Sequence, residues 1–240
     1  MKIINVYSPN FDKKKRSYKS IKFLVIHYTG MQSERESIKR LCNPKAKVSS
    51  HYLISENGKI YRLVMDNRIA WHAGKSCWGK YKNLNKNSIG IEMVNKGHRF
   101  GYSNFKKKQL SNIIKICRYL IKKYKIKRQN VVGHSDIAPL RKIDPGEKFP
   151  WKKLAKNKIG IWHNLKERDL IKLRKIKIIN KSKVEFFNKL KKIGYCFNGK
   201  KKGSSIKIIK AFQRHYRKEL INGIIDKECL IIAKNISKKI

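Results

Sequence analysis

Residues 23–29 of the chain read Phe23-Leu24-Val25-Ile26-His27-Tyr28-Thr29, an apolar run that ends in polar side chains. Short apolar runs of this kind are typical of strands buried in a sheet, so we expect a strand over residues 21–29. Similar runs predict four more strands, at residues 51–54, 59–64, 88–94 and 131–134. The dipeptide Asn57-Gly58 separates the first two of these, and Asn-Gly is a strong signal for a hairpin turn.

A helical pattern lies between the last two of these strands. From Lys106 to Tyr124, apolar side chains recur every three or four residues and lysines occupy the opposite face, which predicts an amphipathic helix. Strands combined with a long helix predict an α/β domain over residues 1–162. Residues 163–181 are rich in charge and are interpreted as a linker, and residues 182–240 show the apolar spacing of short helices in a small second domain.

The charge of the chain is extreme, with 61 Lys and Arg residues against 15 Asp and Glu residues and a net charge of +46. Such a charge attracts polyanions, among them nucleic acids. Lys, Ile and Asn dominate throughout the surface segments, however, which favours compositional drift as the cause. A nucleic-acid binder needs aromatic or Arg side chains interleaved for base contact, whereas most basic residues here are dispersed lysines. We therefore expect no nucleic-acid partner.

Cysteine usage and the N-terminus bear on the cellular compartment. The five cysteines are scattered, odd in number and nowhere at a Cys-x-x-Cys spacing, so we expect neither a thiolate zinc site nor a disulfide framework, and reduced cysteines in the packing. No apolar run approaches the roughly 20 residues that a transmembrane helix needs. The N-terminus lacks the pattern of a signal peptide. We expect a cytoplasmic monomer, with the periplasm or the outer membrane as the alternative.

Three polar side chains are candidates for a metal site. His27 follows the apolar run at residues 23–26, His134 closes the strand at 131–134, and Asp144 precedes Pro145. Two imidazoles and one carboxylate leave the fourth position of a tetrahedral zinc open for water, as a hydrolytic site needs. Pro145 holds Asp144 in an extended backbone, which fixes the direction of the carboxylate.

Two further residues fit hydrolytic chemistry beside such a metal. Lys142 lies two positions before Asp144, so in an extended segment its ammonium would share the metal side and stabilise an oxyanion. Glu92 is the one carboxylate inside the apolar strand at 88–94, where an unpaired charge is costly. A general base next to metal-bound water would explain it.

Together these segments resemble the zinc-dependent type-2 family of N-acetylmuramoyl-L-alanine amidases, to which animal peptidoglycan recognition proteins are related. The resemblance is closest to bacterial members that accept anhydro-muramoyl peptides as well as intact wall. It covers roughly residues 20–160 and is carried by residues 23–29, 48–54, 70–74, 88–92, 131–139, 141–146 and 149–151.

The resemblance implies a mixed central sheet with helices on its faces and a zinc ion in a groove. It gives His27, His134 and Asp144 as the zinc ligands, Glu92 as the general base and Lys142 as the oxyanion partner. The implied activity is hydrolysis of the amide bond between N-acetylmuramoyl (or anhydro-muramoyl) residues and L-alanine in peptidoglycan or muropeptides, for cell-wall degradation or recycling. A non-catalytic peptidoglycan-binding protein is the alternative.

Other roles also follow from the resemblance. Tyr28 and Thr29, next to the first ligand, look like substrate contacts, and Trp71 and His72 resemble residues that line the groove. His51 either orients the site or packs in the core. The remaining histidines match nothing in the family and are expected at the surface: His98, His163 and His215.

The C-terminal residues resemble a small three-helix peptidoglycan-binding domain. The likeness covers roughly residues 182–235 and is carried by residues 190–195, 209–214 and 222–226. A generic helical bundle is the alternative for this segment.

Overall fold

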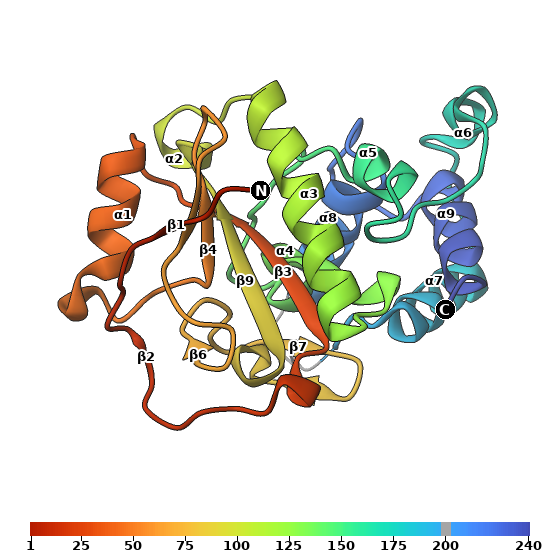
Figure 1. Cartoon of the computed structure of the whole chain (residues 1–240). Helices are drawn as coiled ribbons and strands as arrows, with labels where there is room; N and C mark the ends of the chain where they lie inside the picture. Colours follow the sequence, from red (N-terminus) through yellow and green to blue (C-terminus); the bar gives the residue numbers. More distant parts are fainter. Residues whose placement is uncertain (198–202) are drawn as a thin grey trace.

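The computed structural model of the protein describes residues 1–197 and 203–240, and its centre is a six-stranded sheet (Figure 1). Across the sheet the strands lie in the order β1 (Ile4–Asn5), β5 (Ile60–Arg62), β4 (Tyr52–Ile54), β9 (Ser88–Met93), β3 (Phe23–Tyr28) and β10 (Val131–Gly133). Only the β4–β5 hairpin is antiparallel, and the other neighbours are parallel. The predicted mixed sheet is therefore confirmed.

Two small antiparallel pairs flank this sheet. β2 (Phe11–Asp12) pairs with β6 (Ile69–Ala70), and β7 (Cys77–Trp78) pairs with β8 (Tyr81–Lys82). The short α1 (Glu34–Cys42) begins at Ser33, whose hydroxyl accepts a hydrogen bond from the Glu36 backbone N–H. Leu41 of α1 packs against Leu53 of β4, and in Figure 1 α1 lies at the left of the sheet and the C-terminal helices at the right.

One face of the sheet is covered by the long helix predicted from the sequence. This helix, α3 (Lys107–Tyr124), buries its apolar stripe in a cluster that includes Leu24, Ile26 and Ile91 of the sheet. Trp151 and Leu154 of α5 (Trp151–Lys156) join the same cluster. Because side chains alternate along a strand, Phe23, Val25 and His27 of β3 point to the other face.

The C-terminal helices cover part of that other face. Phe23, Val25 and Val132 of the sheet share one buried cluster with Phe186 and Phe212 of the C-terminal segment. The three expected helices are α7 (Asn180–Ile193), α8 (Ser204–Tyr216) and α9 (Lys227–Ser237). The interpreted linker, residues 163–181, contains α6 (Glu167–Leu173), whose Leu170 also enters this cluster. The C-terminal helices and the sheet are thus held by a common core.

Two short helices lie near the carboxyl end of the parallel strands. α2 (Gly97–Phe100) follows β9, and α4 (His134–Ile137) follows β10 directly, so His134 begins a helix instead of closing the strand. Within the described residues, no helix is both long and apolar enough to cross a membrane.

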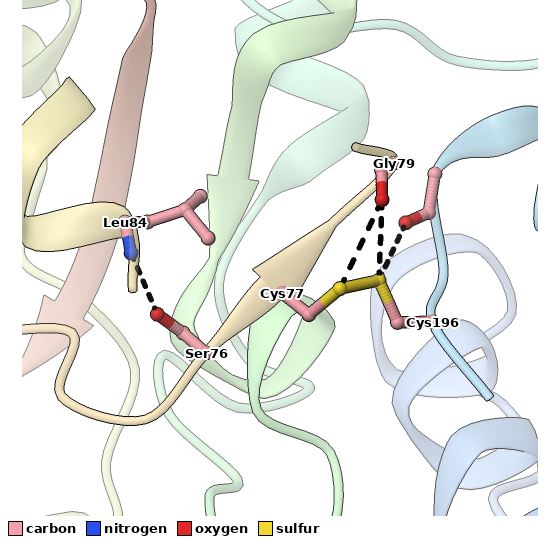
Figure 2. The surroundings of a disulfide bond; sticks show 6 residues. Ser76, Cys77, Gly79, Leu84 and Cys196 are labelled. Carbon is pink, nitrogen blue, oxygen red and sulfur yellow. Dashed lines mark hydrogen bonds between the residues drawn. A yellow bond between two sulfur atoms is a disulfide. The ribbon is translucent and has the colours of Figure 1, made fainter. Parts of the chain in front are cut away.

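A disulfide bond contradicts the expectation that all cysteines are reduced. Cys77 of β7 is bonded to Cys196, which follows α7 (Figure 2). Next to it, the Gly79 N–H donates a 2.7 Å hydrogen bond to the Gly194 carbonyl. The two cysteines are 119 positions apart, and only the docking of α7 brings them together, so no local spacing could indicate the pair. Cys42, Cys117 and Cys229 are free thiols.

The surface position expected for His215 is wrong. Its side chain is 4% exposed and is stacked between the rings of Trp151 and Tyr216, each with a centroid 4.0 Å away. Trp151 and His215 meet only because α8 packs against α5, a contact between distant parts of the chain. His98 is exposed as expected, and His163 is half-buried.

Candidate active site

The parallel strands bring the predicted catalytic residues to one edge of the sheet. His27 of β3 and Glu92 of β9 are direct partners in the parallel register, so their side chains leave the same face. Gly133 of β10 pairs with Ile26, which places His134 beside His27. Asp144 reaches the same place from the loop after α4, and its carbonyl accepts a 2.8 Å hydrogen bond from the Ser135 N–H.

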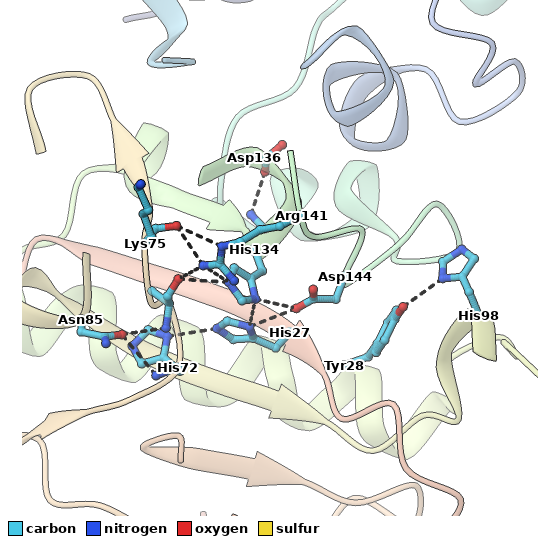
Figure 3. A network of polar contacts seen from close by, with 12 residues as sticks. His27, Tyr28, His72, Lys75, Asn85, His98, His134, Asp136, Arg141 and Asp144 are labelled. Atoms are coloured by element: carbon cyan, nitrogen blue, oxygen red, sulfur yellow. Dashed lines mark hydrogen bonds and ion pairs between the residues drawn. The ribbon is translucent and has the colours of Figure 1, made fainter. Parts of the chain in front are cut away.

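The three predicted metal ligands converge on one point (Figure 3). His27 Nδ1 lies 3.0 Å from His134 Nδ1 and 3.0 Å from Asp144 Oδ2, and the third separation is 3.1 Å. Zinc held tetrahedrally by ligands at about 2.0–2.1 Å needs ligand atoms about 3.3 Å apart. Two imidazole nitrogens and one carboxylate oxygen at this spacing suit zinc, and all three side chains are buried.

In both histidines the second ring nitrogen, Nε2, has a hydrogen-bond partner, so Nδ1 is the nitrogen that can bind a metal. His27 Nε2 lies 3.0 Å from His72 Nδ1, and His134 Nε2 lies 3.2 Å from the Ala73 carbonyl. The carbonyl accepts only, and at 3.2 Å it lies nearer to Nε2 than the Arg141 guanidinium does at 3.4 Å, so we assign the proton of His134 to Nε2. Metal-binding histidines are commonly oriented in this way by partners behind them. Both partners belong to one segment, residues 70–74, whose Trp71 and His72 were expected to line the groove.

His72 lies behind the predicted metal ligand His27. It is 5% exposed, and its Nε2 lies 3.1 Å from Ser88 Oγ, which in turn donates to the Leu84 carbonyl at 2.6 Å. Because Ser88 donates its only proton to that carbonyl, it accepts from His72 Nε2–H, and His72 Nδ1 is left to accept from His27 Nε2–H. The chain of hydrogen bonds thus fixes the tautomer of His27. A substrate contact by His72 stays a prediction.

Glu92 has the environment of a general base. Its side chain is 8% exposed, and its Oε2 has no hydrogen-bond partner among the described residues. Burial, followed by the charge of Asp144, raises the pKa of Glu92 to about 8, and the positive charge of Lys142 opposes this shift. A pKa near neutrality suits a group that must both take up and release a proton.

The pKa values of two predicted metal ligands are shifted in the opposite direction from that of Glu92. Burial, helped by the charge of His134, lowers the pKa of His27 to about 4, which keeps the ring neutral. Burial disfavours the charged form of Asp144, but His134 and His27 outweigh it and hold the pKa of this carboxyl well below its usual range. A neutral imidazole and an ionised carboxylate are the forms that bind zinc.

Lys142 and its neighbour Arg141 precede Asp144 in the loop after α4. Lys142 is half-buried, and its charge acts on both Glu92 and His27. Arg141, which the sequence analysis missed, donates from its guanidinium to the Ala73 and Lys75 carbonyls. It thereby holds the segment whose Ala73 carbonyl orients His134. No local pattern singles out this arginine in a chain so rich in basic residues.

The residues expected to contact substrate are distributed around the site. Tyr28 is half-buried at the rim, and its hydroxyl lies 3.0 Å from Nδ1 of the exposed His98 (Figure 3). Thr29 Oγ1 donates to the Asn95 carbonyl at 3.3 Å, and Trp71 Nε1 donates to Asp12 Oδ1 at 2.6 Å. Their contacts with substrate stay predictions.

His51 lies in the core beneath the site. It is fully buried, and its Nδ1 accepts a 3.0 Å hydrogen bond from the Gly90 N–H. A β-carbon at Gly90 would lie 2.4 Å from the ring of His72, so only glycine leaves room for that ring. These contacts describe packing in the core, and a role of His51 in orienting the site stays a prediction.

The family model described as N-acetylmuramoyl-L-alanine amidase matches residues 17–147, which include all five predicted ligands and catalytic residues. The chain belongs to this amidase family. N-acetylmuramoyl-L-alanine amidase AmiD of Escherichia coli is 36% identical over 236 residues, which cover 93% of this chain and 84% of that protein. The 1,6-anhydro-N-acetylmuramyl-L-alanine amidase AmpD of Haemophilus influenzae is 33% identical over 62% of this chain and 88% of that protein.

Solved structures of amidases agree with the whole fold. E. coli AmiD, in complex with anhydro-N-acetylmuramic acid-L-Ala-D-γ-Glu-L-Lys, matches with a TM-score of 0.83 and 34% identity over 95% of this chain and 93% of that chain. AMPDH3 of Pseudomonas aeruginosa matches with a TM-score of 0.81 and 29% identity over 96% of each chain. These two likenesses extend over the C-terminal helices, whereas the match to Haemophilus AmpD covers only 62% of this chain.

The C-terminal helices of this amidase contact α4, the helix that begins with His134. Asp136 of α4 accepts hydrogen bonds from the Gly133 N–H, the Tyr195 hydroxyl and His215 Nδ1, all at 2.7 Å. Gly133 and Asp136 flank the ligand His134 in the sequence. The C-terminal segment therefore supports the backbone that carries one predicted metal ligand.

Proposed function

We propose that this protein is a zinc-dependent N-acetylmuramoyl-L-alanine amidase that cleaves the amide between the muramoyl lactyl group and L-alanine. The observation that carries the proposal is the buried triangle of His27 Nδ1, His134 Nδ1 and Asp144 Oδ2, with sides of 3.0–3.1 Å, beside Glu92 on the neighbouring strand. The names of the relatives, both muramyl-L-alanine amidases, point to the same bond.

The residues of the chain divide the chemistry between them. His27, His134 and Asp144 would hold zinc, which when bound supplies a Lewis acid for the amide carbonyl and lowers the pKa of water. Glu92 Oε2 takes the proton of the attacking water and passes it to the leaving nitrogen of L-alanine. The ammonium of Lys142 stabilises the negative charge that develops on the carbonyl oxygen.

The substrate class includes anhydro-muropeptides. The ligands named for two solved relatives are anhydro-N-acetylmuramic acid-L-Ala-D-γ-Glu-L-Lys in AmiD and anhydromuramic pentapeptide in AMPDH3. Both relatives match this chain over nearly its whole length, which supports the same type of ligand here. Binding of intact wall by the three C-terminal helices is part of the proposal.

An oxidising compartment accompanies this function. Disulfides persist outside the reducing cytosol, and Cys77–Cys196 is such a bond. It favours the periplasmic alternative over the cytoplasmic expectation. This point is tested by treating the producing cells with a thiol-trapping reagent. If the disulfide forms in the cell, Cys77 and Cys196 should escape modification, whereas reduced cysteines at these positions should be modified.

The activity is tested with purified sacculi and with a defined anhydro-muropeptide, and the products are identified by mass. The zinc-loaded protein should release peptides that begin with L-alanine together with peptide-free muramoyl sugars. Chelator treatment and Glu92→Gln should each abolish this release, whereas Glu56→Gln, at an exposed carboxylate, should not. Binding of sacculi without any release would instead establish the non-catalytic alternative.

A further inference from the structure

A second cavity lies away from the zinc site, where the C-terminal helices meet α5. Its volume is about 540 Å³, and it is bounded by α5, by the segment from Trp162 to Arg174 and by the end of α8 with part of α9. Trp151 and His215, whose rings are stacked, belong to its lining. Neither the three metal ligands nor Glu92 line it.

Unsatisfied polar atoms concentrate around this cavity. Six buried side-chain nitrogen and oxygen atoms have no hydrogen-bond partner among the described residues, and one of these is Glu92 Oε2 at the catalytic site. The other five belong to residues that line the cavity: Trp162 Nε1, His163 Nδ1, His215 Nε2, and Arg217 Nε and Nη2. Native proteins leave few buried polar groups unpaired, so such a cluster indicates a missing partner.

Three of the five unpaired atoms, those of Arg217 and Trp162, call for an acceptor. Arg217 is 1% exposed, and only its Nη1 is engaged, with Asp226 Oδ2 at 2.9 Å and Glu228 Oε2 at 3.3 Å. An arginine carries donors only, so its free Nε–H and Nη2–H can be satisfied solely by an acceptor. The indole Nε1 of Trp162 is likewise a donor.

Charge favours an anion as that acceptor. The lining includes seven basic side chains and three acidic ones, and one acid, Glu228, is already paired with Arg174 at 2.8 Å. Arg214 is half-buried in the lining and makes no hydrogen bond or ion pair within residues 1–197 and 203–240. Basic residues at a helix C-terminus can serve the helix dipole alone. That role does not satisfy the buried N–H groups of Arg217 and Trp162.

We propose that this cavity is a binding site for a small molecule that carries a carboxylate or a phosphate, with the oxyanion held by Arg217 and Arg214. Planar guanidinium groups bind such oxyanions through two parallel hydrogen bonds. The volume falls in the range of small-molecule pockets and exceeds what one oxyanion fills. The remainder of the ligand packs against the aromatic walls formed by Trp151, Trp162 and Tyr216.

Calorimetric titration of the zinc-loaded protein at constant ionic strength tests the site. One probe is inorganic phosphate, and the other is the tripeptide L-Ala-D-γ-Glu-L-Lys, whose carboxylates could also reach the catalytic zinc. Saturable binding of either probe, at one site per chain, is expected. Binding of phosphate but not of the tripeptide would assign a phosphate ligand, and binding of the tripeptide but not of phosphate would assign a carboxylate ligand. Binding of both probes would indicate a general oxyanion site.

Matched variants locate the binding. Arg214→Gln, and Arg217→Lys, which keeps a charge for Asp226 but loses the guanidinium fork, should each weaken binding about tenfold or more. Arg118→Lys, on α3 and outside the cavity, should bind as the wild type does. If Arg217→Lys does not fold, the change in probe binding of Arg214→Gln alone tests the proposal. Absence of saturable binding, or binding that both arginine variants leave unchanged, overturns the proposal.

Discussion

Glu92 shows what the proposed general base costs the stability of the fold. Its pKa is raised to about 8 by burial and by Asp144, against an ordinary value of 4.5, so the metal-free folded state retains a proton that the unfolded chain has lost between these pH values. Where the folded state binds more protons, stability falls as the pH rises. The carboxyl group therefore destabilises the metal-free protein progressively from pH 4.5 to pH 8.

Replacing Glu92 by glutamine should consequently stabilise the metal-free protein at alkaline pH. We expect Glu92→Gln to exceed the wild type by a few kcal/mol, in order of magnitude, at pH 8 and to match it near pH 4.5. Urea unfolding of chelator-treated protein at the two pH values measures the difference. Glu56→Gln, at an exposed carboxylate, serves as the control. A variant no more stable than the wild type at pH 8 would contradict a buried, proton-retaining Glu92.

His72 should act on zinc affinity through His27. In His72→Phe a flat ring remains above Gly90, but the acceptor for His27 Nε2–H, 3.0 Å away, is lost. Changes to the groups behind a metal ligand commonly weaken metal binding by about 10–100-fold. Competition with a zinc chelator should show a loss of this size, with a smaller loss in the same direction for Ser88→Ala. His98→Gln, at the exposed rim, should retain wild-type zinc affinity.

At the scale of elements, the sequence predicts the apolar face of strand β9 and its carboxylate, but not the need for glycine at position 90. Its alternation places Ile89, Ile91 and Met93 in the cluster under α3, as an apolar strand requires. Glu92 stands out in the sequence because a carboxylate breaks that apolar run. Gly90 gives no such signal, since its purpose depends on the ring of His72, which approaches from another part of the chain.

Across the whole site, too, some residues can be predicted from the sequence and others cannot. His27, His134 and Asp144 each follow a local signal, a strand end or an Asp-Pro turn, and the structure confirms their convergence. Arg141 and the Ala73 carbonyl carry no signal of their own, because a backbone acceptor is invisible in the sequence and Arg141 is one of many basic residues. Sequence patterns thus indicate the groups that do chemistry better than the groups that orient them.

Gly90→Ala tests the fit between β9 and the segment at residues 70–74. The added methyl group would lie 2.4 Å from His72 Cγ, and the strand and the ring cannot both keep their places. Overpacking of this kind typically costs about 1–3 kcal/mol, and displacement of His72 should weaken zinc binding as well. Thermal unfolding and chelator competition measure the two effects. In the background of His72→Ala, which removes the ring, Gly90→Ala should cost much less, because the two changes are not additive when the residues touch. An equal cost in both backgrounds would exclude the clash.

At the scale of the whole molecule, the C-terminal helices contribute to the catalytic domain. They fill the cluster on the face of β3 that also carries His27, and Tyr195 and His215 hydrogen-bond to Asp136 two positions after His134. The sequence predicted the three helices from their apolar spacing. Their docking could not be predicted, because it rests on contacts between residues far apart in the chain, among them the bond from Cys77 to Cys196.

Reduction of this disulfide should destabilise the protein as one unit. A cross-link between residues 119 positions apart restricts the unfolded chain strongly, and the typical stabilisation is about 2–4 kcal/mol. Because the sheet and α7–α9 share a buried cluster, we expect a single transition that moves to lower temperature on reduction, without separate melting of the C-terminal helices. The double variant Cys77→Ser/Cys196→Ser should melt where the reduced wild type melts and should not respond to reductant. Cys42→Ser, which removes a free thiol, should respond as the wild type does. If reduction instead produced two transitions, with zinc still bound after the first, the C-terminal helices would be an independent module and their support of His134 through Asp136 would be dispensable.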